Sequence, residues 1–416
     1  MANANKTPAI RFKGFTDDWE QRKFSELTEI RSASRVHKEE WQSSGVPFYR
    51  SSDVMAALNG TENEKAFISE ELYEKLSVVS GKLEEGDVLV TGGGSVGKPY
   101  IVPNNEPLYT KDADLLWIKN NENLDPYFVY TFFFSPTFTD YLNSVSHVGT
   151  IAHYTITQLG ETPITLPCVS EQQKIGDYFR NLDTLITLHQ RNLEKLRNIK
   201  KSMLQKMFPR NGANKPEIRF KGFTDAWEQR MFGDENDLIT GYPFESDHFS
   251  ETGLNLIRGM NVKRGYIDLS NDICVKWNSS KGLESYLLKE NDIIIQMDGA
   301  LIGKSYGIIN KKHLPALLVQ RVTRARTKSK IADPYFMYQT IQRDFLTYII
   351  LNKTETAVPH LSLNDIKSFR IMVPTLSEQK MIGAFFANLD NLIIFHKCKY
   401  DKYTSIKSGL IRKLFP

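Results

Sequence analysis

Two long stretches of the chain carry apolar residues at intervals of three and four positions, the pattern of a helix that packs along another helix. They predict helices over about residues 171–208 and 378–415. The seven-residue repeat runs through Ile175, Leu182, His189 and Leu196 in the first stretch and through Ile382, Leu389, His396 and Tyr403 in the second. We predict that the two helices pair in antiparallel fashion, which brings His189 and His396 together at their midpoints. The alternative is that each helix lies on its own domain.

Each predicted helix follows a proline and begins with the sequence Ser-Glu-Gln, at Ser170 and at Ser377. A serine followed three residues later by Gln or Glu forms a capping box, in which the serine side chain accepts a hydrogen bond from a backbone amide. Only the first copy has Gln at that later position, whereas the second has Lys380. We expect both serines to cap their helices.

The regions before each helix show a different pattern, in which polar turns are followed by short aliphatic runs. Gly86–Thr91 and Asn291–Gln296 are typical of strands that follow a turn. The sequence Asp-Pro-Tyr-Phe occurs at Asp125 and again at Asp333. Proline is favoured at the first position of a helix, so each of these is expected to start a helix.

The chain is a duplication. The segment PAIRFKGFTDDWEQRKF from Pro8 returns as PEIRFKGFTDAWEQRMF from Pro216, and the helical segments repeat as well, while the material between them diverges. The order predicts a leading segment and first variable domain over residues 1–165, a first spacer helix over 166–210, a linker, leading segment and second variable domain over 211–372, and a second spacer helix over 373–416. Two similar frames with different contents indicate a pseudo-two-fold molecule that reads two different things.

Composition narrows the class of protein only slightly. The net charge of +4 over 416 residues is compatible with nucleic acid but does not require it. The cysteines, Cys168, Cys274 and Cys398, have no counterparts in the other half, which argues against a disulfide framework or a zinc site and fits a reducing cytoplasm. No apolar run approaches the roughly 20 residues of a membrane span.

A glycine-rich loop superficially resembles a nucleotide-binding P-loop. Gly92–Lys98 is followed by Pro99, where a P-loop has the hydroxyl that binds magnesium, and a strand is predicted next instead of a helix. The matching loop in the second half, Asp298–Ser305, has Asp298 in place of the first glycine. Nucleotide hydrolysis is therefore not expected. The loop either brings backbone close to a phosphate chain or is a tight hairpin turn with a solvated lysine.

No catalytic constellation is found in the sequence, neither a zinc-protease motif nor a nucleophile elbow. His153 and His360 are the repeated histidines outside the helices, and each is either a DNA-facing donor or a residue that fixes a turn. The predicted helices are rich in Lys and Arg, which usually marks a solvated face but also suits a phosphate backbone or an acidic partner.

At this point the chain resembles the specificity subunits of type I restriction–modification systems. The resemblance rests on the alternation of variable regions with Ser-Glu-Gln helices, on the Asn-Leu-Asp-x-Leu-Ile core of each helix, and on the duplicated Gly-Phe-Thr-Asp-x-Trp-Glu-Gln-Arg segments. It implies an α+β fold with two target-recognition domains related by a pseudo-two-fold axis and separated by two long antiparallel coiled-coil helices.

The resemblance also implies a function without catalysis. Each target-recognition domain would read one half of a bipartite, asymmetric site on double-stranded DNA, and the helices would fix the spacing. Two methylation subunits would dock on the helices and supply S-adenosylmethionine chemistry, and motor and nuclease subunits would complete restriction. This chain itself would bind no cofactor and no membrane, and it would be located in the cytoplasm. A stand-alone DNA-binding regulator and a coiled-coil scaffold stay open as rival functions.

Candidate DNA contacts are polar and basic residues of the two variable regions, among which Arg can pair with guanine and Asn or Gln with adenine. For the first region they are Arg50, Ser51, Ser52, Thr91, Ser95, Lys98, Lys111, His153 and Tyr154. For the second they are Arg258, Asn261, Lys263, Gln296, Lys304, Gln320, Arg321, His360 and Ser362. No metal-ligating set is expected.

Overall fold

The computed structural model describes residues 7–145, 153–210, 212–299, 301–352 and 360–415. The chain divides into two compact units. The first unit comprises Met1–Asn192 with His396–Pro416, and the second comprises Leu193–Phe395. Each unit therefore contains one variable region and one half of each long helix, so the units cut across the domain boundaries expected from the sequence. Among the described residues, no helix combines the length and apolarity needed to cross a membrane.

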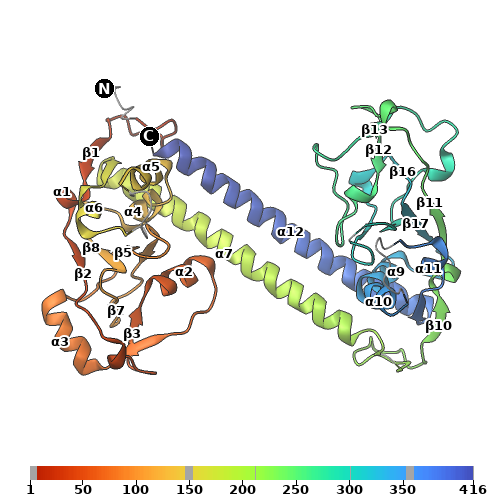
Figure 1. Ribbon diagram of the computed structural model, residues 1–416, viewed down its shortest axis with the longest axis horizontal. Coiled ribbons are helices and arrows are strands. Elements are labelled where there is room, and N and C mark those ends of the chain that lie inside the picture. The colour runs from red at the N-terminus through yellow and green to blue at the C-terminus, as the bar shows by residue number, and fades with distance from the viewer. Residues whose placement is uncertain (1–6, 146–152, 211, 300, 353–359, 416) are drawn as a thin grey trace. The chain divides into compact units, whose positions relative to one another are not determined.

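The first unit is built on three small sheets (Figure 1). The four-stranded sheet has the order β2 (Ile30–Ser32), β8 (Leu115–Ile118), β5 (Val88–Thr91) and β6 (Pro99–Ile101). The three-stranded sheet has the order β4 (Ala66–Ile68), β3 (Val46–Tyr49) and β7 (Tyr109–Thr110), and the two-stranded sheet pairs β1 (Glu20–Lys23) with β9 (Pro163–Leu166). The strand predicted at residues 86–91 is thus confirmed as β5.

Short helices surround these sheets. They are α1 (Phe24–Leu27), α2 (Ser51–Asn59), α3 (Glu70–Ser80), α4 (Pro126–Phe132), α5 (Pro136–Val145) and α6 (Ile156–Glu161), with a 3-10 turn, η1, at Lys38–Glu40. The predicted start of α4 is confirmed: Asp125 caps it by accepting a hydrogen bond of 2.8 Å from the Phe128 amide, and Pro126 is its first residue. Phe128 and Phe132 then bury their rings against Trp19 and the sheet.

The second unit repeats this topology strand for strand. The four-stranded sheet has the order β11 (Asn236–Thr240), β17 (Val322–Thr327), β14 (Ile293–Gln296) and β15 (Tyr306–Ile308). The three-stranded sheet has the order β13 (Lys276–Trp277), β12 (Leu254–Ile257) and β16 (Ala316–Leu318). The two-stranded sheet pairs β10 (Glu228–Met231) with β18 (Arg370–Val373). Its helices are α8 (Phe232–Glu235), α9 (Pro334–Thr340), α10 (Leu346–Asn352) and α11 (Leu363–Lys367), with short turns η2 (Ser246–His248), η3 (Gly259–Asn261), η4 (Glu284–Tyr286), η5 (Lys311–His313) and a π-helical turn η6 (Ile341–Phe345). The duplicated sequence therefore folds as a duplicated topology.

Two long helices, α7 (Val169–Lys206) and α12 (Leu376–Leu414), each contribute residues to both units. They run antiparallel within each unit. In the first unit, Lys407 Nζ lies 2.5 Å from Asp183 Oδ1, and in the second, Lys200 Nζ lies 2.6 Å from Asp390 Oδ1. These are the same ion pair in the two copies. The apolar repeat residues bury their side chains beside them, as the heptad pattern predicted: Ile175 and Leu182 in the first core, Ile382 and Leu389 in the second, with Leu196 and Tyr403 partly buried.

The two histidines of the repeat meet, as the antiparallel register predicted. His189 Nδ1 and His396 Nδ1 lie 2.8 Å apart, and the His189 ring stacks on Tyr403 with 5.7 Å between ring centroids. The seam is therefore interrupted at this level by a polar pair in which one imidazole donates to the other.

The Ser-Glu-Gln sequences do not cap the helices, so this prediction was wrong. Both α7 and α12 begin one residue before the serine, so Ser170 and Ser377 lie inside the first helical turn. In α7 the carbonyl of Cys168 accepts hydrogen bonds from the amides of Glu171 and Gln172. The motif instead makes tertiary bonds. Glu171, fully buried, accepts two hydrogen bonds of 2.8 Å from the Arg11 guanidinium.

The glutamine of the motif links the helix to the variable region. Gln172 Oε1 accepts from the Asp125 amide at 3.1 Å, while its Nε2 donates to the carbonyl of Pro167 at 3.0 Å. The second unit repeats both contacts, with Arg219 on Glu378 at 2.7 Å and the Asp333 amide on Gln379 at 3.1 Å. The motif thus joins leading segment, helix and variable region at one point.

We predict that Arg219→Met destabilises the second unit by about 3–5 kcal/mol, because it leaves the buried Glu378 carboxylate without its partner. The double variant Arg219→Met/Glu378→Gln should recover part of that loss, since no buried charge remains. Urea unfolding measures both. A single variant as stable as the double one would show that the pair is solvated and unimportant.

We also predict that the helix pair weakens as the pH falls. Burial, and then the charges of His396 and Lys399, lower the pKa of His189 below its usual value of about 6.5. Below that pH the unfolded chain binds more protons than the folded one. The contribution of the neutral His189 to the free energy of unfolding is therefore fully present above the usual pKa and is lost as the pH falls below it. The melting temperature should drop between about pH 7.5 and about pH 5.5, and His189→Gln should reduce this drop. The exposed His248→Gln is the matched control, and an equal pH dependence in all three proteins would contradict the account.

Candidate nucleic-acid interface

In the first unit, four loops meet at one end of the four-stranded sheet. The glycine-rich β5–β6 loop is tied to its neighbours through Gly92, whose amide donates to the carbonyl of Asp114 and whose carbonyl accepts from the amide of Tyr154, both at 2.8 Å. The turn after β3 joins them, because Ser51 Oγ donates to the same Asp114 carbonyl at 3.0 Å. Residues far apart in the sequence therefore form one continuous surface.

The second unit brings the equivalent loops together in the same way. The amide of Met297 donates to the carbonyl of Arg321 at 3.0 Å, and the carbonyl of Met297 accepts from the amide of Leu361 at 2.8 Å. Gln296 Nε2 donates to the carbonyl of Asp298 at 2.7 Å. The backbone pattern is conserved between the units, and the side chains presented by it are different.

Three predicted contact residues are buried. Thr91 and Asn261 are 0% exposed and Tyr154 is 1% exposed, so none can reach a base in this conformation. The Thr91 hydroxyl accepts from the Lys98 amide at 2.8 Å, and Asn261 Nδ2 donates to the carbonyl of Asp268 at 2.9 Å. Tyr154 shares a hydrogen bond with Thr162. The structure does not support these three as DNA contacts, because their polar groups hold the loops in place.

The matched arginines Arg50 and Arg258 are half-buried, and the guanidinium group of each already has partners within its own unit. Arg50 lies over the Trp41 ring and pairs with Asp53 at 3.0 Å. Arg258 lies over the Phe249 ring and donates to the carbonyl of Ile273 at 2.6 Å. Both therefore shape the turns that carry the loops, and neither presents an unoccupied guanidinium at the surface.

The remaining predicted residues lie on or near the surface of the loop cluster. Ser52, Ser95, His153, Lys304, Gln320, Arg321, His360 and Ser362 are exposed, and Ser51, Lys98, Lys111, Lys263 and Gln296 are half-buried. Some have partners within the unit: Lys111 pairs with Asp114 at 2.5 Å, and Ser362 caps α11 by accepting from the Asp365 amide at 3.1 Å. The exposed members are the side chains able to reach a ligand.

Asp298 organises the loops of the second unit, a role that the sequence did not reveal. Its carboxylate contacts His360 Nδ1 through one oxygen and lies 3.4 Å from Arg321 Nε through the other. Arg321 itself adopts the left-handed conformation, with a φ of 69°. Strand pairing places Gly93, and not the Gly92 of the sequence alignment, at the equivalent position of the first unit, where the nearby carboxylate is that of Asp114 on another loop. The signal was the replacement of a loop glycine by Asp298.

The glycine-rich loop of the first unit is a tight turn between two strands. Gly94 and Gly97 have φ values of 70° and 75°, and a Cβ on Gly97 would lie 2.7 Å from the Phe138 ring. Since β6 follows directly, no helix N-terminus is present to bind a nucleotide phosphate. The geometry agrees with the exclusion of a P-loop.

Comparison with known proteins identifies the duplicated frame. The sequence model of the type I restriction modification DNA specificity domain matches residues 16–198 and again residues 236–402. The chain belongs to this family. It is thus a specificity component of a type I restriction–modification system, and a DNA-binding rather than a catalytic protein.

Individual relatives agree with this assignment. The chain is 29% identical over 220 residues to the type I restriction enzyme EcoAI specificity subunit of Escherichia coli, a match that covers 52% of this chain but only 37% of that relative. It is 24% identical over 344 residues to the MjaVIII specificity subunit of Methanocaldococcus jannaschii, covering 80% of this chain and 79% of that one.

A solved structure shares the fold of this specificity protein. The crystal structure of a type I restriction–modification S subunit from M. genitalium aligns with a TM-score of 0.68 over 99% of each chain, at 15% sequence identity. At that identity the likeness supports the architecture alone, α+β with two variable domains and long helices.

Proposed function

We propose that each unit reads one half of a bipartite, asymmetric site on double-stranded DNA. The observation that carries this proposal is the pair of loop clusters: equivalent loops are joined by the same backbone hydrogen bonds at the same end of the four-stranded sheet in both units, with different side chains. A protein that reads two unlike half-sites needs this combination of equal frames and unequal surfaces. The family assignment supports the same function.

Within each cluster, the exposed side chains divide by chemistry. Lys304 and Lys98 carry single positive charges on their glycine-rich loops and suit DNA phosphates, which position the protein without specifying sequence. Gln320 and Arg321 form the exposed tip of the β16–β17 connection in the second unit. Gln suits adenine and Arg suits guanine through paired hydrogen bonds, so we assign base contact to this tip.

The arrangement of the DNA site follows from the duplication. Two readers related by a pseudo-two-fold axis engage half-sites about one helical turn, roughly 10 bp, apart. Because the loops differ, the two half-sites differ, with an unread gap between them. We assign the fixing of this spacing to the paired helices α7 and α12.

The same helices are proposed to dock two methylation subunits, which would supply S-adenosylmethionine chemistry, with motor and nuclease subunits completing restriction. An apolar stripe on α12 supports docking. Met381, Leu392 and Phe395 recur at helical spacing on α12 within the second unit, each more than 40% exposed. Tyr178 and Leu188 on α7 within the first unit are exposed to a similar extent. Exposed apolar side chains in a row mark a protein interface.

Two rival functions make different demands. A stand-alone regulator would bind the gapped site tightly without any methylation subunit. A scaffold would show no sequence preference at all. The loop clusters favour a DNA reader over a scaffold, and the apolar stripe on α12 favours an assembled complex over a stand-alone regulator.

We predict that Gln320→Ala changes base preference at one half-site only, at a cost of about 1–3 kcal/mol, whereas Lys304→Ala weakens binding to all sequences and lowers the salt slope by about 1. Binding of the complex with its methylation subunit to duplexes altered in either half-site measures both effects.

The control for these variants is Lys330→Ala, an exposed lysine beyond the opposite end of β17. It should leave affinity and salt slope unchanged. If Gln320→Ala weakened every duplex equally, or none, the assignment of base reading to this loop would be wrong.

For docking, Leu392→Lys should weaken binding of a methylation subunit by about tenfold or more, because it places a charge in an apolar interface. The neighbouring exposed Asn391→Lys adds the same charge on another face of α12 and is the matched control. Both variants should keep the stability of the parent chain. Equal affinity for the two variants would remove the stripe from the interface.

A further inference from the structure

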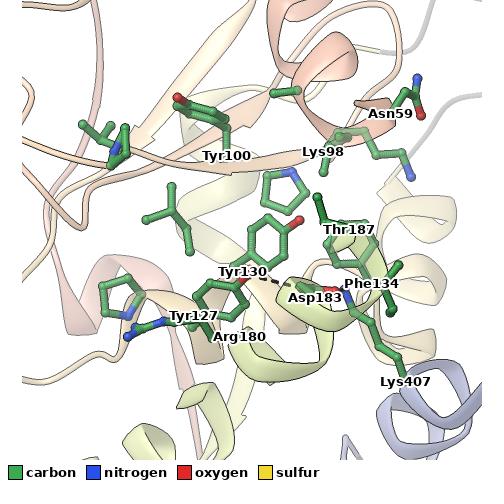
Figure 2. Close-up of a pocket in the computed structure, with 18 of the residues that line it drawn as sticks. Asn59, Lys98, Tyr100, Tyr127, Tyr130, Phe134, Arg180, Asp183, Thr187 and Lys407 are labelled. Atoms are coloured by element: carbon green, nitrogen blue, oxygen red, sulfur yellow. Dashed lines mark hydrogen bonds and ion pairs between the residues drawn. The ribbon is translucent and has the colours of Figure 1, made fainter. Parts of the chain in front are cut away.

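The first unit contains a groove of about 1120 Å³, and Lys98 is the one predicted DNA contact among its lining residues (Figure 2). Its walls come from α2, β6, α4 and the long helices. Tyr127 and Tyr130 lie on one side, and Lys98, Arg180 and Lys407 bring positive charges to it. The volume exceeds the roughly 300–1,000 Å³ of typical small-molecule sites.

One wall of this groove is the open edge of a sheet. Strand β6 is the last strand of its sheet, and hydrogen bonds from the Thr91 amide to the Lys98 carbonyl and from the Val102 amide to the Asp87 carbonyl fix its orientation. Because strand residues alternate, the Pro99 carbonyl and both backbone groups of Ile101 point away from β5. Pro99 and Ile101 both line the groove.

In the second unit the equivalent edge is covered by the protein's own chain. Tyr306 on β15 accepts from the Gly265 amide at 2.9 Å and donates its own amide to the carbonyl of Lys263 at 3.1 Å. The hydroxyl of Tyr338 on α9 donates to the carbonyl of Gly265 at 2.8 Å. An extended segment, Lys263–Gly265, therefore lies along the strand edge and is held by a tyrosine.

The first unit has this receptor without the segment. Tyr130 is the counterpart of Tyr338 in the repeated Asp-Pro-Tyr-Phe helix, and it lines the groove. Within the described residues, its hydroxyl has no hydrogen-bond partner. After Arg50 the chain forms the nine-residue helix α2, whereas after Arg258 it forms a single turn and then the covering segment.

The charges of the two sites also differ. Both have the interhelical ion pair, Lys407 with Asp183 in the first unit and Lys200 with Asp390 in the second. The first unit adds Arg180, where the aligned residue of the second is Ala387. Lys98 lies where strand pairing places Ser305 in the second unit, next to Lys304. Arg180 is half exposed beside the Tyr127 ring, and its guanidinium lies 3.4 Å from the exposed carboxylate of Asp177. An occupant of the first site should therefore be more acidic than the basic segment that fills the second.

We propose that this groove binds an extended, acidic segment of a partner polypeptide, which adds as a strand to the open edge of β6. Strand addition supplies affinity through main-chain hydrogen bonds, while side-chain pockets supply specificity. The second unit provides the pattern for the bound state. The proposal goes beyond DNA reading, and it does not depend on which bases the loops contact.

The test uses the full chain and two synthetic peptides. One has the sequence of residues 261–269, and the other is the same peptide with Lys263→Glu and Arg264→Glu. We expect the acidic peptide to bind more tightly in fluorescence anisotropy and to slow exchange of the Ile101 amide, the backbone N–H of β6 that points away from β5. Tyr130→Phe should weaken its binding about fivefold and Arg180→Glu about tenfold or more.

Tyr338→Phe is the matched control, since it removes the equivalent hydroxyl from the occupied site and should leave peptide affinity unchanged. Absence of peptide binding, or binding that Tyr130→Phe and Arg180→Glu leave unchanged, would overturn the proposal. If Arg180→Glu instead weakened duplex DNA binding while the peptide failed to bind, the groove would belong to the nucleic-acid interface, and the proposal would equally fail. Unfolding curves of each variant confirm that the fold is retained.

Discussion

The structure depends on one buried ion pair, made twice. Arg11 and Arg219, from the repeated leading segments, each bind a glutamate that is fully buried in the first turn of a long helix. A buried carboxylate is tolerated only with a hydrogen-bonded partner, so the leading segment is fixed to the helix. The next residue, Gln172 or Gln379, then binds the backbone where α4 or α9 begins. Three parts of each unit are thus joined at one polar centre.

The residues that hold each unit together are different from those that its loops expose. The two halves can therefore diverge at the loops without losing their fold. The residues that repeat are those of the polar centre, the helix seam and the helix starts. The residues that differ lie on the loops at the end of the central sheet and along its edge. Asp298 contacts His360 and Arg321 on neighbouring loops, whereas Gly93 at the same position has no side chain to make such contacts. The edge of β15 is covered by the chain itself, while the edge of β6 borders a groove.

The sequence predicted what depends on local periodicity. The heptad pattern predicted the contact between His189 and His396, and the Asp-Pro sequences predicted the starts of α4 and α9. Both depend on helix register and capping, which are decided within a few residues. It failed where the outcome depends on the tertiary path. Thr91, Tyr154 and Asn261 are polar residues next to strands or turns, and only the folded loops decide that they point inward. The role of Glu171 was likewise hidden, since its partner lies in a distant segment.

The most direct test of the account is the methylation map of DNA from cells that express this chain with a methylation subunit of the same system. The account predicts methyl-adenine on both strands of one gapped motif whose two halves differ in sequence. A map without new methylation, although the methylation subunit is bound to this chain, would contradict the claim that two unlike loop clusters read two half-sites.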